Sequence, residues 1–192
     1  MGLLPPGAAV TGGSALLDGE DVLSMSPKRR NEVRGSKVAM LFQQPKVMLD
    51  PTARVGGQVA ESLRRHRGVG RREAKARVVE MLRDVGIPEP ARRASAFSYQ
   101  LSGGMAQRVM IAAALSADPE LVIADEPTTG LDVTVQAQIL ELLKSKRDEL
   151  GLSILLITHD LGIVSSMADR VAVMYAGRIV EEGATADIFN DP

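Results

Sequence analysis

The sequence predicts an α/β fold with a largely parallel sheet, and the arrangement of its short apolar runs carries that prediction. Residues 37–42, 121–124 and 153–158 have the length and apolar character of buried strands, and the second run suits burial on both faces. Segments with apolar residues at helical spacing lie between the runs, and this alternation favours a parallel sheet. An antiparallel β edge and an inserted group of helices complete the predicted architecture.

Composition limits the classes of function. The chain has 192 residues, enough for one domain with an elaboration, and 45% hydrophobic with 24% charged residues is typical of a globular protein. The net charge is −1 and only 3% of residues are aromatic, so neither an overall field nor stacking platforms favour nucleic acid. The absence of cysteine excludes disulfides. No run approaches the roughly 20 apolar residues of a membrane span.

The first elements of the chain are short. Residues 10–22 contain an Asp-Gly pair, a strong hairpin signal, and we expect short antiparallel strands there at an edge. Residues 26–35 are polar and basic and favour a short helix and loop. The strand at 37–42 runs into Gln43, whose amide oxygen can bind Mg²⁺ or orient water. A glutamine taken alone at such a place is more often an ordinary loop residue.

Residues 55–86 are predicted to form two helices. Gly68-Val69-Gly70 interrupts the helical spacing, and Gly86 ends the second helix before a proline. The expected apolar positions are Val59, Leu63, Ala76, Val79, Leu82 and Val85. The stretch is rich in arginine, and a solvated basic face is favoured over nucleic-acid binding because the whole chain is nearly neutral. His66 is expected to be a surface residue and not a ligand.

Ser102 is predicted to cap a helix over residues 105–115. Serine is a favoured N-cap, and Gly103 and Gly104 let a ligand approach the backbone closely. The free N–H groups at a helix start suit an anion such as phosphate. An ordinary capped helix is the more frequent explanation for such a motif by itself.

Two carboxylates follow the run at 121–124. Because open α/β sheets bind ligands at the carboxyl ends of their strands, Asp125 is placed to hold Mg²⁺ and Glu126 to polarise an attacking water as general base. In isolation, two solvated acids at a strand end are an equally frequent explanation. The strand at 153–158 delivers His159 to the same edge, where an imidazole can hydrogen-bond a γ-phosphate and hold water in line.

Asp132 is predicted to cap a long helix that reaches about Leu150 and stops at Gly151. Its expected apolar face consists of Val133, Ala137, Leu140, Leu143, Arg147 and Leu150. A short helix over residues 162–168 and a hairpin over residues 170–182 follow. The hairpin closes the predicted fold.

The motifs, in this order, resemble those of the ATP-binding-cassette (ABC) ATPases. LSGG at residues 101–104, with Gln107 downstream, matches that family's signature motif, and LVIADEP matches its Walker B strand with the catalytic glutamate. TGLD, which ends in Leu131 and Asp132, resembles the D-loop, and His159 resembles the switch histidine. The run DVTVQAQIL narrows the resemblance to the ATPase subunits of dipeptide, oligopeptide or nickel importers.

The resemblance implies a role for each residue, with ATP and Mg²⁺ as cofactors. Gln43 matches the Q-loop position and would share Mg²⁺ with Asp125, while Glu126 would activate water and His159 would steady the transition state. Two cassettes would face head to tail, and the signature of one would contact the ATP of the other. The residues of that contact would be Leu101, Ser102, Gly103, Gly104 and Gln107, with Leu131 and Asp132 in the D-loop.

The resemblance also implies an architecture and a cellular setting. The fold would be a P-loop NTPase-like cassette, with a RecA-like core from residues 1–52 and 117–192 and a helical subdomain from residues 53–116. The expected function couples ATP hydrolysis to import of peptides or nickel at the cytoplasmic face of the membrane. The expected partners are a second cassette, identical or different, transmembrane permease subunits and, indirectly, an extracytoplasmic solute-binding protein, with no nucleic acid. The sequence does not select the solute.

One motif of the family is not found. A phosphate-binding loop needs G-x-x-x-x-G-K-[ST], and the sequence contains no Gly-Lys pair. We therefore expect a core that is incomplete at the N-terminus, a shortened C-terminus, and no ATPase activity from this chain alone. An alternative hypothesis is a non-hydrolytic partner whose signature face completes the ATP site of another cassette. A DNA-repair or translation cassette is a third hypothesis, which the DVTVQAQIL run disfavours.

Overall fold

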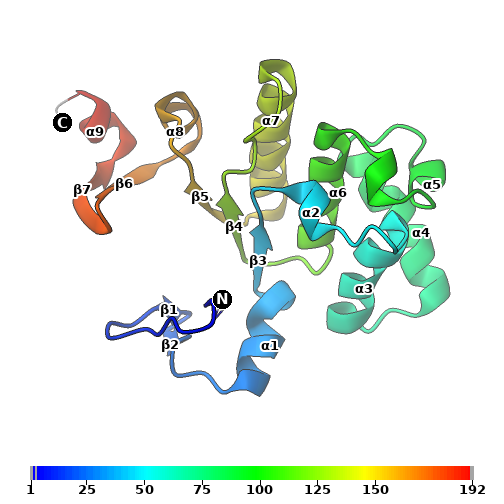
Figure 1. The fold of residues 1–192 in the computed structure, drawn as a ribbon, viewed down its shortest axis with the longest axis horizontal. Helices are drawn as coiled ribbons and strands as arrows, with labels where there is room; N and C mark the ends of the chain where they lie inside the picture. Colours follow the sequence, from blue (N-terminus) through cyan, green and yellow to red (C-terminus); the bar gives the residue numbers. More distant parts are fainter. Residues whose placement is uncertain (1, 3, 191–192) are drawn as a thin grey trace.

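A three-stranded parallel sheet lies at the centre of the computed structural model, which describes residues 2 and 4–190 (Figure 1). Its strands are β3 (Val38–Leu41), β4 (Leu121–Asp125) and β5 (Ser153–Ile157), in the order β3-β4-β5. All neighbouring pairs are parallel and in register from their first residues. The α/β class and the parallel sheet are therefore confirmed at the residues that the apolar runs predicted.

The antiparallel strands are also confirmed, but each pair forms a sheet of its own. The first pair is β1 (Leu16–Leu17) and β2 (Glu20–Asp21), joined by Asp18 and Gly19 with φ of 51° and 79°. Two central residues with positive φ make the type of turn that matches the twist of a hairpin. The second pair is β6 (Arg170–Tyr175) and β7 (Arg178–Ala184). Neither pair extends the edge of the parallel sheet.

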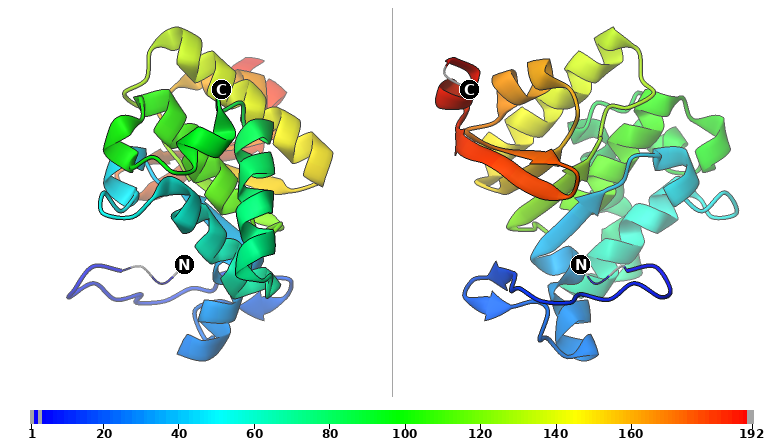
Figure 2. Two further views of the ribbon diagram at one scale, coloured as in Figure 1. Left: turned by 90° about the vertical axis from the view of Figure 1, so that its right-hand side faces the viewer. Right: turned by 60° about the vertical axis from the view of Figure 1, so that its left-hand side comes forward.

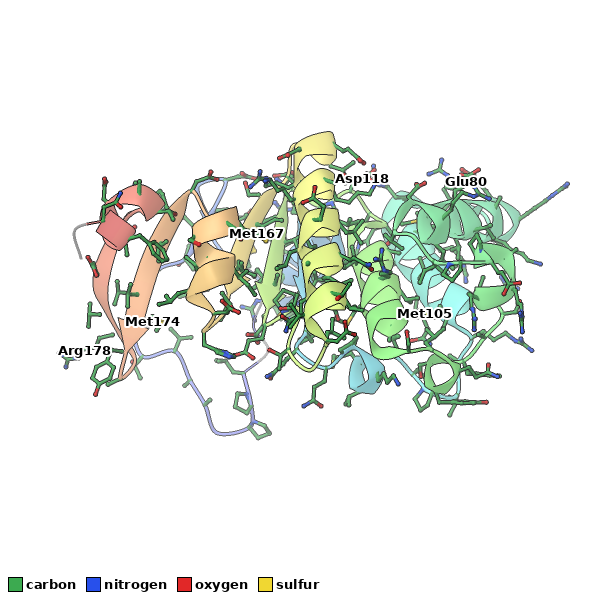
Figure 3. The ribbon with its side chains drawn as sticks, turned by 90° about the horizontal axis from the view of Figure 1, so that it is seen from above. Glu80, Met105, Asp118, Met167, Met174 and Arg178 are labelled. Carbon is green, nitrogen blue, oxygen red and sulfur yellow. The ribbon has the colours of Figure 1, made fainter. Side chains whose placement is uncertain are left out.

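The helices lie to both sides of the central sheet (Figures 1 and 2). They are α1 (Pro27–Ser36), α2 (Pro45–Met48), α3 (Val55–Arg67), α4 (Arg71–Asp84), α5 (Pro90–Arg93), the 3-10 helix η1 (Ser98–Gln100), α6 (Gly103–Leu115), α7 (Val133–Leu150), α8 (Leu161–Met167) and α9 (Thr185–Asn190). Seen from above, the hairpin residues Met174 and Arg178 lie at one end of the molecule and Glu80 of α4 at the other (Figure 3). Among the described residues, no helix is both long and apolar enough to cross a bilayer.

Local hydrogen bonds set the helix ends where the sequence predicted them. The Ser102 hydroxyl accepts from the Met105 N–H at 3.2 Å, and the Asp132 carboxylate accepts from the Val135 N–H at 3.0 Å. Gly151 ends α7 in the left-handed conformation that glycine adopts without strain. The short helices α2, α5, η1 and α9 were not predicted, because segments of 3, 4 or 6 residues are too short to show helical periodicity.

The main core joins one face of the parallel sheet to α3, α4, α6 and α7. Its largest fully buried side chains are Leu41, Leu82, Ile111, Ile139, Gln107, Val55, Val59, Val78, Val109 and Val122. These residues come from strands and helices that are far apart in the sequence. The core therefore fixes the edge of the sheet relative to the start of α6, and both of these carry candidate functional residues.

The buried face of α4 differs from the predicted one. Ala74 and Val78 are buried together with Leu82, whereas Ala76 is exposed and Val79 is half-buried. Both sets of positions have helical spacing, so periodicity alone did not choose between them. The choice follows from the position of α3, against which α4 packs.

The buried face of α7 was predicted only in part. Ile139 and Leu143 are buried, but Val133 is 81% and Leu150 is 47% exposed. Arg147 lies at the edge of the contact, where its guanidinium donates to the Met167 carbonyl. The predicted Ala137 is exposed while the neighbouring Ile139 is buried, so the buried face of α7 is turned relative to the predicted stripe.

Strand β5 is covered on one side only. Ile154 and Leu156 pack against the main core, whereas Leu155 is 52% and Ile157 is 47% exposed. The prediction of a buried strand at residues 153–158 is thus correct for one face. Parallel sheets are usually covered on both faces, and within the described residues the second face of β5 is open to solvent.

His66 is partly buried, which differs from the predicted surface position. Its imidazole lies against Gly35, where an added Cβ would come within 2.6 Å of Nε2. Burial and, secondly, the charge of Arg65 lower the pKa of His66 below its ordinary value. Folding therefore favours the neutral imidazole.

We expect part of the stability of this protein to be lost in mild acid because of His66. The folded pKa is depressed, so below about pH 6.5 the unfolded chain binds the proton more readily and the free energy of unfolding falls. Urea unfolding of wild type and His66→Gln, from neutral pH to below about pH 6.5, measures the effect. His66→Gln should show the smaller loss in the free energy of unfolding. His159→Gln is the matched control, because it removes the other of the 2 histidines in the chain. An equal acid loss in wild type and His66→Gln would contradict the expectation.

Candidate functional site

The carboxylate of Glu126 is the meeting point of residues from three neighbouring strand ends. Gln43 follows β3, Glu126 follows β4 and His159 comes two residues after β5. The Gln43 amide nitrogen donates to Glu126 Oε2 at 3.0 Å, and His159 Nδ1 lies 2.9 Å from Oε1. The structure thus brings together three residues that the sequence placed at one edge.

A fourth residue, Thr129, also contacts this carboxylate. Its hydroxyl donates to Glu126 Oε2 at 2.7 Å. This contact, first, and that of His159, second, lower the pKa of Glu126 below its usual range, although burial acts in the opposite direction. Each donor favours the charged form. Glu126 is consequently an ionised acceptor at neutral pH.

The backbone of Glu126 has an unusual conformation. Its φ is 45°, a left-handed value that is uncommon for a residue with a side chain. The Glu126 N–H still donates to the Ile157 carbonyl at 2.9 Å, so the strand pairing continues to this residue. The chain then turns at once, and the Thr129 N–H donates back to the Glu126 carbonyl at 3.2 Å. Such outliers cluster at functional sites, where the surrounding structure holds the strain.

Asp125 and Gln43 have the donor atoms that suit Mg²⁺. Asp125 is the last residue of β4 and lies in register with Ile157, at the same edge as Glu126. Mg²⁺ prefers oxygen ligands and typically takes only one or two carboxylates beside water and phosphate oxygens. The described residues contain no group of three or more His, Cys, Asp or Glu side chains that would form a cage of their own. One carboxylate and one amide oxygen fit a magnesium ion that is shared with phosphates.

The start of α6 packs against the residues that lead into α7. An added Cβ on Gly103 would meet Leu131 Cδ2 at 3.2 Å, and one on Gly104 would meet Val135 Cγ1 at 2.6 Å. Leu101 is buried at 3% exposure, while Ser102 is exposed and caps the helix. The two glycines therefore allow a close approach between segments that the sequence named as signature motif and D-loop.

Gln107 lies apart from the exposed helix start. Its side chain is 1% exposed, and its Nε2 atom is buried without a hydrogen-bond partner. The sequence grouped Leu101 and Gln107 with the exposed Ser102 in the expected nucleotide contact, but the structure places both Leu101 and Gln107 inside the core. The reason is helical geometry: Gln107 lies one turn further along α6, on the side that faces the protein.

Two residues with informative contacts were missed in the sequence. Arg108 donates from Nη1 to the Val85 carbonyl at 2.6 Å and from Nη2 to Gln138 Oε1 at 3.1 Å, which ties α6 to the end of α4 and to α7. No local signal identifies these long-range partners. Thr129 was missed as a partner of Glu126, although a threonine three residues after an acid, in a turn with proline, is a usable signal.

The close packing of Gly104 predicts a destabilising substitution. In Gly104→Ala the new methyl group would push against Val135, whose β-branched side chain has little rotamer freedom. We expect a loss of about 1–2 kcal/mol in the free energy of unfolding, because the overpacking outweighs the better helix propensity of alanine. Urea unfolding measures this change.

Gly57→Ala on α3 is the matched control, because nothing lies within 4 Å of the Cβ that would be added there. We expect this variant to gain up to about 1 kcal/mol, since alanine is the better helix former. A second substitution, Val135→Ala, should restore much of the stability lost in Gly104→Ala. If both glycine variants were equally stable, the steric explanation would be wrong.

Comparison with known proteins gives a consistent result over nearly the whole chain. The family profile described as ABC transporter matches residues 1–129. The oligopeptide transport ATP-binding protein OppD of Bacillus subtilis is 52% identical over 98% of this chain, and the dipeptide transport ATP-binding protein DppD of the same organism is 50% identical over 100% of it. The match covers 52% and 58% of those relatives, so the chain spans little more than half of their length.

Solved structures show the same fold. The ATP-binding cassette MJ0796, in a dimeric post-hydrolysis state bound to ADP and Pi, has a TM-score of 0.80 at 29% identity and covers 91% of this chain and 74% of its own. The protein cbiO1 of Clostridium perfringens, described as part of the transporter complex cbiONQ, has a TM-score of 0.77 at 30% identity, over 94% and 69% of the two chains.

Proposed function

The chain belongs to the ABC transporter family, and on that premise we propose that it is the ATP-binding subunit of an importer that takes up peptides. Its family is one of ATPases. The observation that carries the proposal is the meeting of Gln43, Glu126 and His159 at one edge of the parallel sheet. That edge is where α/β sheets place their ligands. The three side chains are of the types that handle a phosphate, a metal ion and an attacking water.

Within this proposal Glu126 is the general base. An ionised carboxylate can accept a proton from a water molecule as that water attacks phosphorus. His159 lies beside the same carboxylate and provides a ring nitrogen that hydrogen-bonds charge developing on phosphate oxygens. Gln43 and Asp125 provide the oxygen atoms for Mg²⁺. Bound Mg²⁺ and ATP would supply charge neutralisation and the phosphoryl group that is transferred.

The signature surface is proposed to act on the nucleotide of a second cassette. Ser102 is exposed and stands at the start of a helix of 13 residues, where free N–H groups and the helix dipole favour an anion. Gly103 and Gly104 place this start directly beside the Leu131 loop. The dimeric state of the similar MJ0796 cassette supports a head-to-tail pair. Leu101 and Gln107 are both buried and are proposed to support the helix start from within, without touching the nucleotide.

Peptides are the proposed class of transported solute, because the similar proteins are described as peptide transport subunits. Both Bacillus subtilis proteins are described as transport ATP-binding proteins for oligopeptides or dipeptides. Identities of 50% and 52% over nearly the full chain favour this class over nickel. The transmembrane subunits and a solute-binding protein are the proposed further partners, at the cytoplasmic face of the membrane.

The proposed division of the chain is a core with an inserted helical subdomain. Residues 53–116 hold α3 to α6, which stand together on one side of the central sheet (Figure 1). Residues 1–52 and 117–192 would form the nucleotide-binding core. Two side chains of the helical part reach the core: Arg108 donates to Gln138 of α7, and Arg67 of α3 forms an ion pair with Asp118.

Uptake by cells tests the proposed function. Deletion of the gene should abolish ATP-dependent uptake of a labelled dipeptide or oligopeptide, and the reintroduced gene should restore it. Uptake of labelled nickel, measured in the same cells, is the comparison for the competing cargo. Unchanged peptide uptake in the deletion strain would overturn the proposal. Loss of nickel uptake alone would show that nickel, and not peptides, is the transported solute.

A further inference from the structure

Thr129 is the partner of Glu126 that comes from its own loop. Gln43 and His159 reach the carboxylate from neighbouring strand ends, whereas Thr129 lies three residues further along the same turn. Its Oγ1–Oε2 distance of 2.7 Å is the shortest of the three contacts. The hydroxyl also has the largest effect among the groups that lower the pKa of Glu126.

The turn that carries Thr129 is anchored at several points. The Thr129 N–H donates to the Glu126 carbonyl at 3.2 Å, so residue 129 contacts residue 126 with both backbone and side chain. Pro127 and Thr128 between them are buried. The Thr128 carbonyl accepts from Gln136 Nε2 of α7 at 3.2 Å. The position of the hydroxyl is therefore set by the fold, although the side chain itself is exposed.

The contacts divide unequally between the two carboxylate oxygens. Oε2 accepts from both Gln43 and Thr129, whereas Oε1 has its contact with His159. A carboxylate oxygen has two lone-pair directions. Two donors occupy both directions at Oε2, so Oε1 keeps one direction for a further donor, on the side of His159.

We propose that Thr129 is a positioning residue, whose hydroxyl fixes the rotation of the Glu126 carboxylate so that Oε1 is the oxygen presented to the attacking water. The inference rests on the proposed role of Glu126 as general base. Thr129 does not touch the reacting atoms and acts through the carboxylate. With the hydroxyl removed, the carboxylate is held by Gln43 and His159 alone, so its plane can rotate and neither oxygen is kept in line with the water.

Substitutions at Thr129 separate the effect of the hydroxyl group from the effect of the side chain's shape. Thr129→Val has nearly the same volume and no donor, while Thr129→Ser keeps the donor. Because the side chain is exposed, neither change removes core packing, and both variants should fold as wild type does. Thr134→Val, at another exposed threonine in the first turn of α7, is the matched control.

The experiment is steady-state ATP hydrolysis by the chain assembled with the proposed second cassette and transmembrane subunits. In Thr129→Val we expect kcat to fall about 10-fold with KM for ATP unchanged, because the proposed general base is present but no longer oriented. Thr129→Ser and Thr134→Val should hydrolyse ATP as wild type does. A wild-type kcat in Thr129→Val, or an equal loss in Thr129→Ser, would overturn the proposal.

This outcome is separate from that of the proposed function. Glu126→Gln, measured in the same assay, reports on the proposed general base itself. If Glu126→Gln leaves hydrolysis unchanged, the role of Glu126 as base is wrong. If Glu126→Gln abolishes hydrolysis and Thr129→Val keeps the wild-type kcat, the base stands and the positioning role of Thr129 is wrong.

Discussion

Replacement of Glu126 by glutamine is expected to lower ATP hydrolysis by the assembled transporter at least about 100-fold. Glutamine has nearly the same shape and can still accept hydrogen bonds from Thr129 through its amide oxygen. An amide cannot take up a proton from water at neutral pH, so the proposed general base is lost while the site keeps its form. Phosphate release by the chain, assembled with the proposed second cassette and transmembrane subunits, measures the effect.

Glu141→Gln provides the control for this prediction. Glu141 is an exposed glutamate of α7, so the same change of charge occurs away from the strand edge. Its hydrolysis rate should match that of wild type. Equal rates in all three proteins would show that Glu126 is not the base, and equal losses in both variants would indicate a general effect of charge.

Replacement of Leu82 by alanine is expected to cost about 2–5 kcal/mol of the free energy of unfolding. Leu82 is 0% exposed and belongs to the main core, where α4 packs beside α3 and α6. The substitution removes buried methyl groups and leaves a cavity that a close-packed interior fills only in part. The midpoint and slope of urea unfolding measure the loss.

Leu150→Ala is the control with the same chemistry. Leu150 is 47% exposed at the end of α7, so its truncation removes little buried area. We expect a change of no more than about 0.5 kcal/mol there. A similar cost at both leucines would mean that α4 does not bury the face seen in the structure.

Most of the candidate site was predictable because its residues follow strands in a regular way. The parallel strands β3, β4 and β5 end at one edge, so Gln43, Glu126 and His159 had to lie near one another once the strands were recognised. What the sequence did not reveal was the pattern of contacts. Its prediction named a base and a histidine, whereas the structure adds the Thr129 hydroxyl and the division of donors between Oε1 and Oε2.

The buried faces of the helices, in contrast, were not predictable from the sequence. Two sets of positions on α4 had helical spacing, and only the packing against α3 selected Ala74 and Val78. Gln107 was grouped with exposed residues because it follows the LSGG motif, yet it is 1% exposed. In each case the local pattern allowed more than one face to be buried.

The sequence by itself determined the strands, the helix ends and the family. Strands and helix ends depend on residues within a few positions of one another, so a local sequence pattern is enough to predict them. Examples are the N-caps Ser102 and Asp132 and the C-terminal glycine Gly151. Only the tertiary structure decided which helix faces are buried, that one side of β5 is open, and that Arg108 joins three helices. Those features depend on contacts between segments far apart in the chain, whose distances no local pattern specifies.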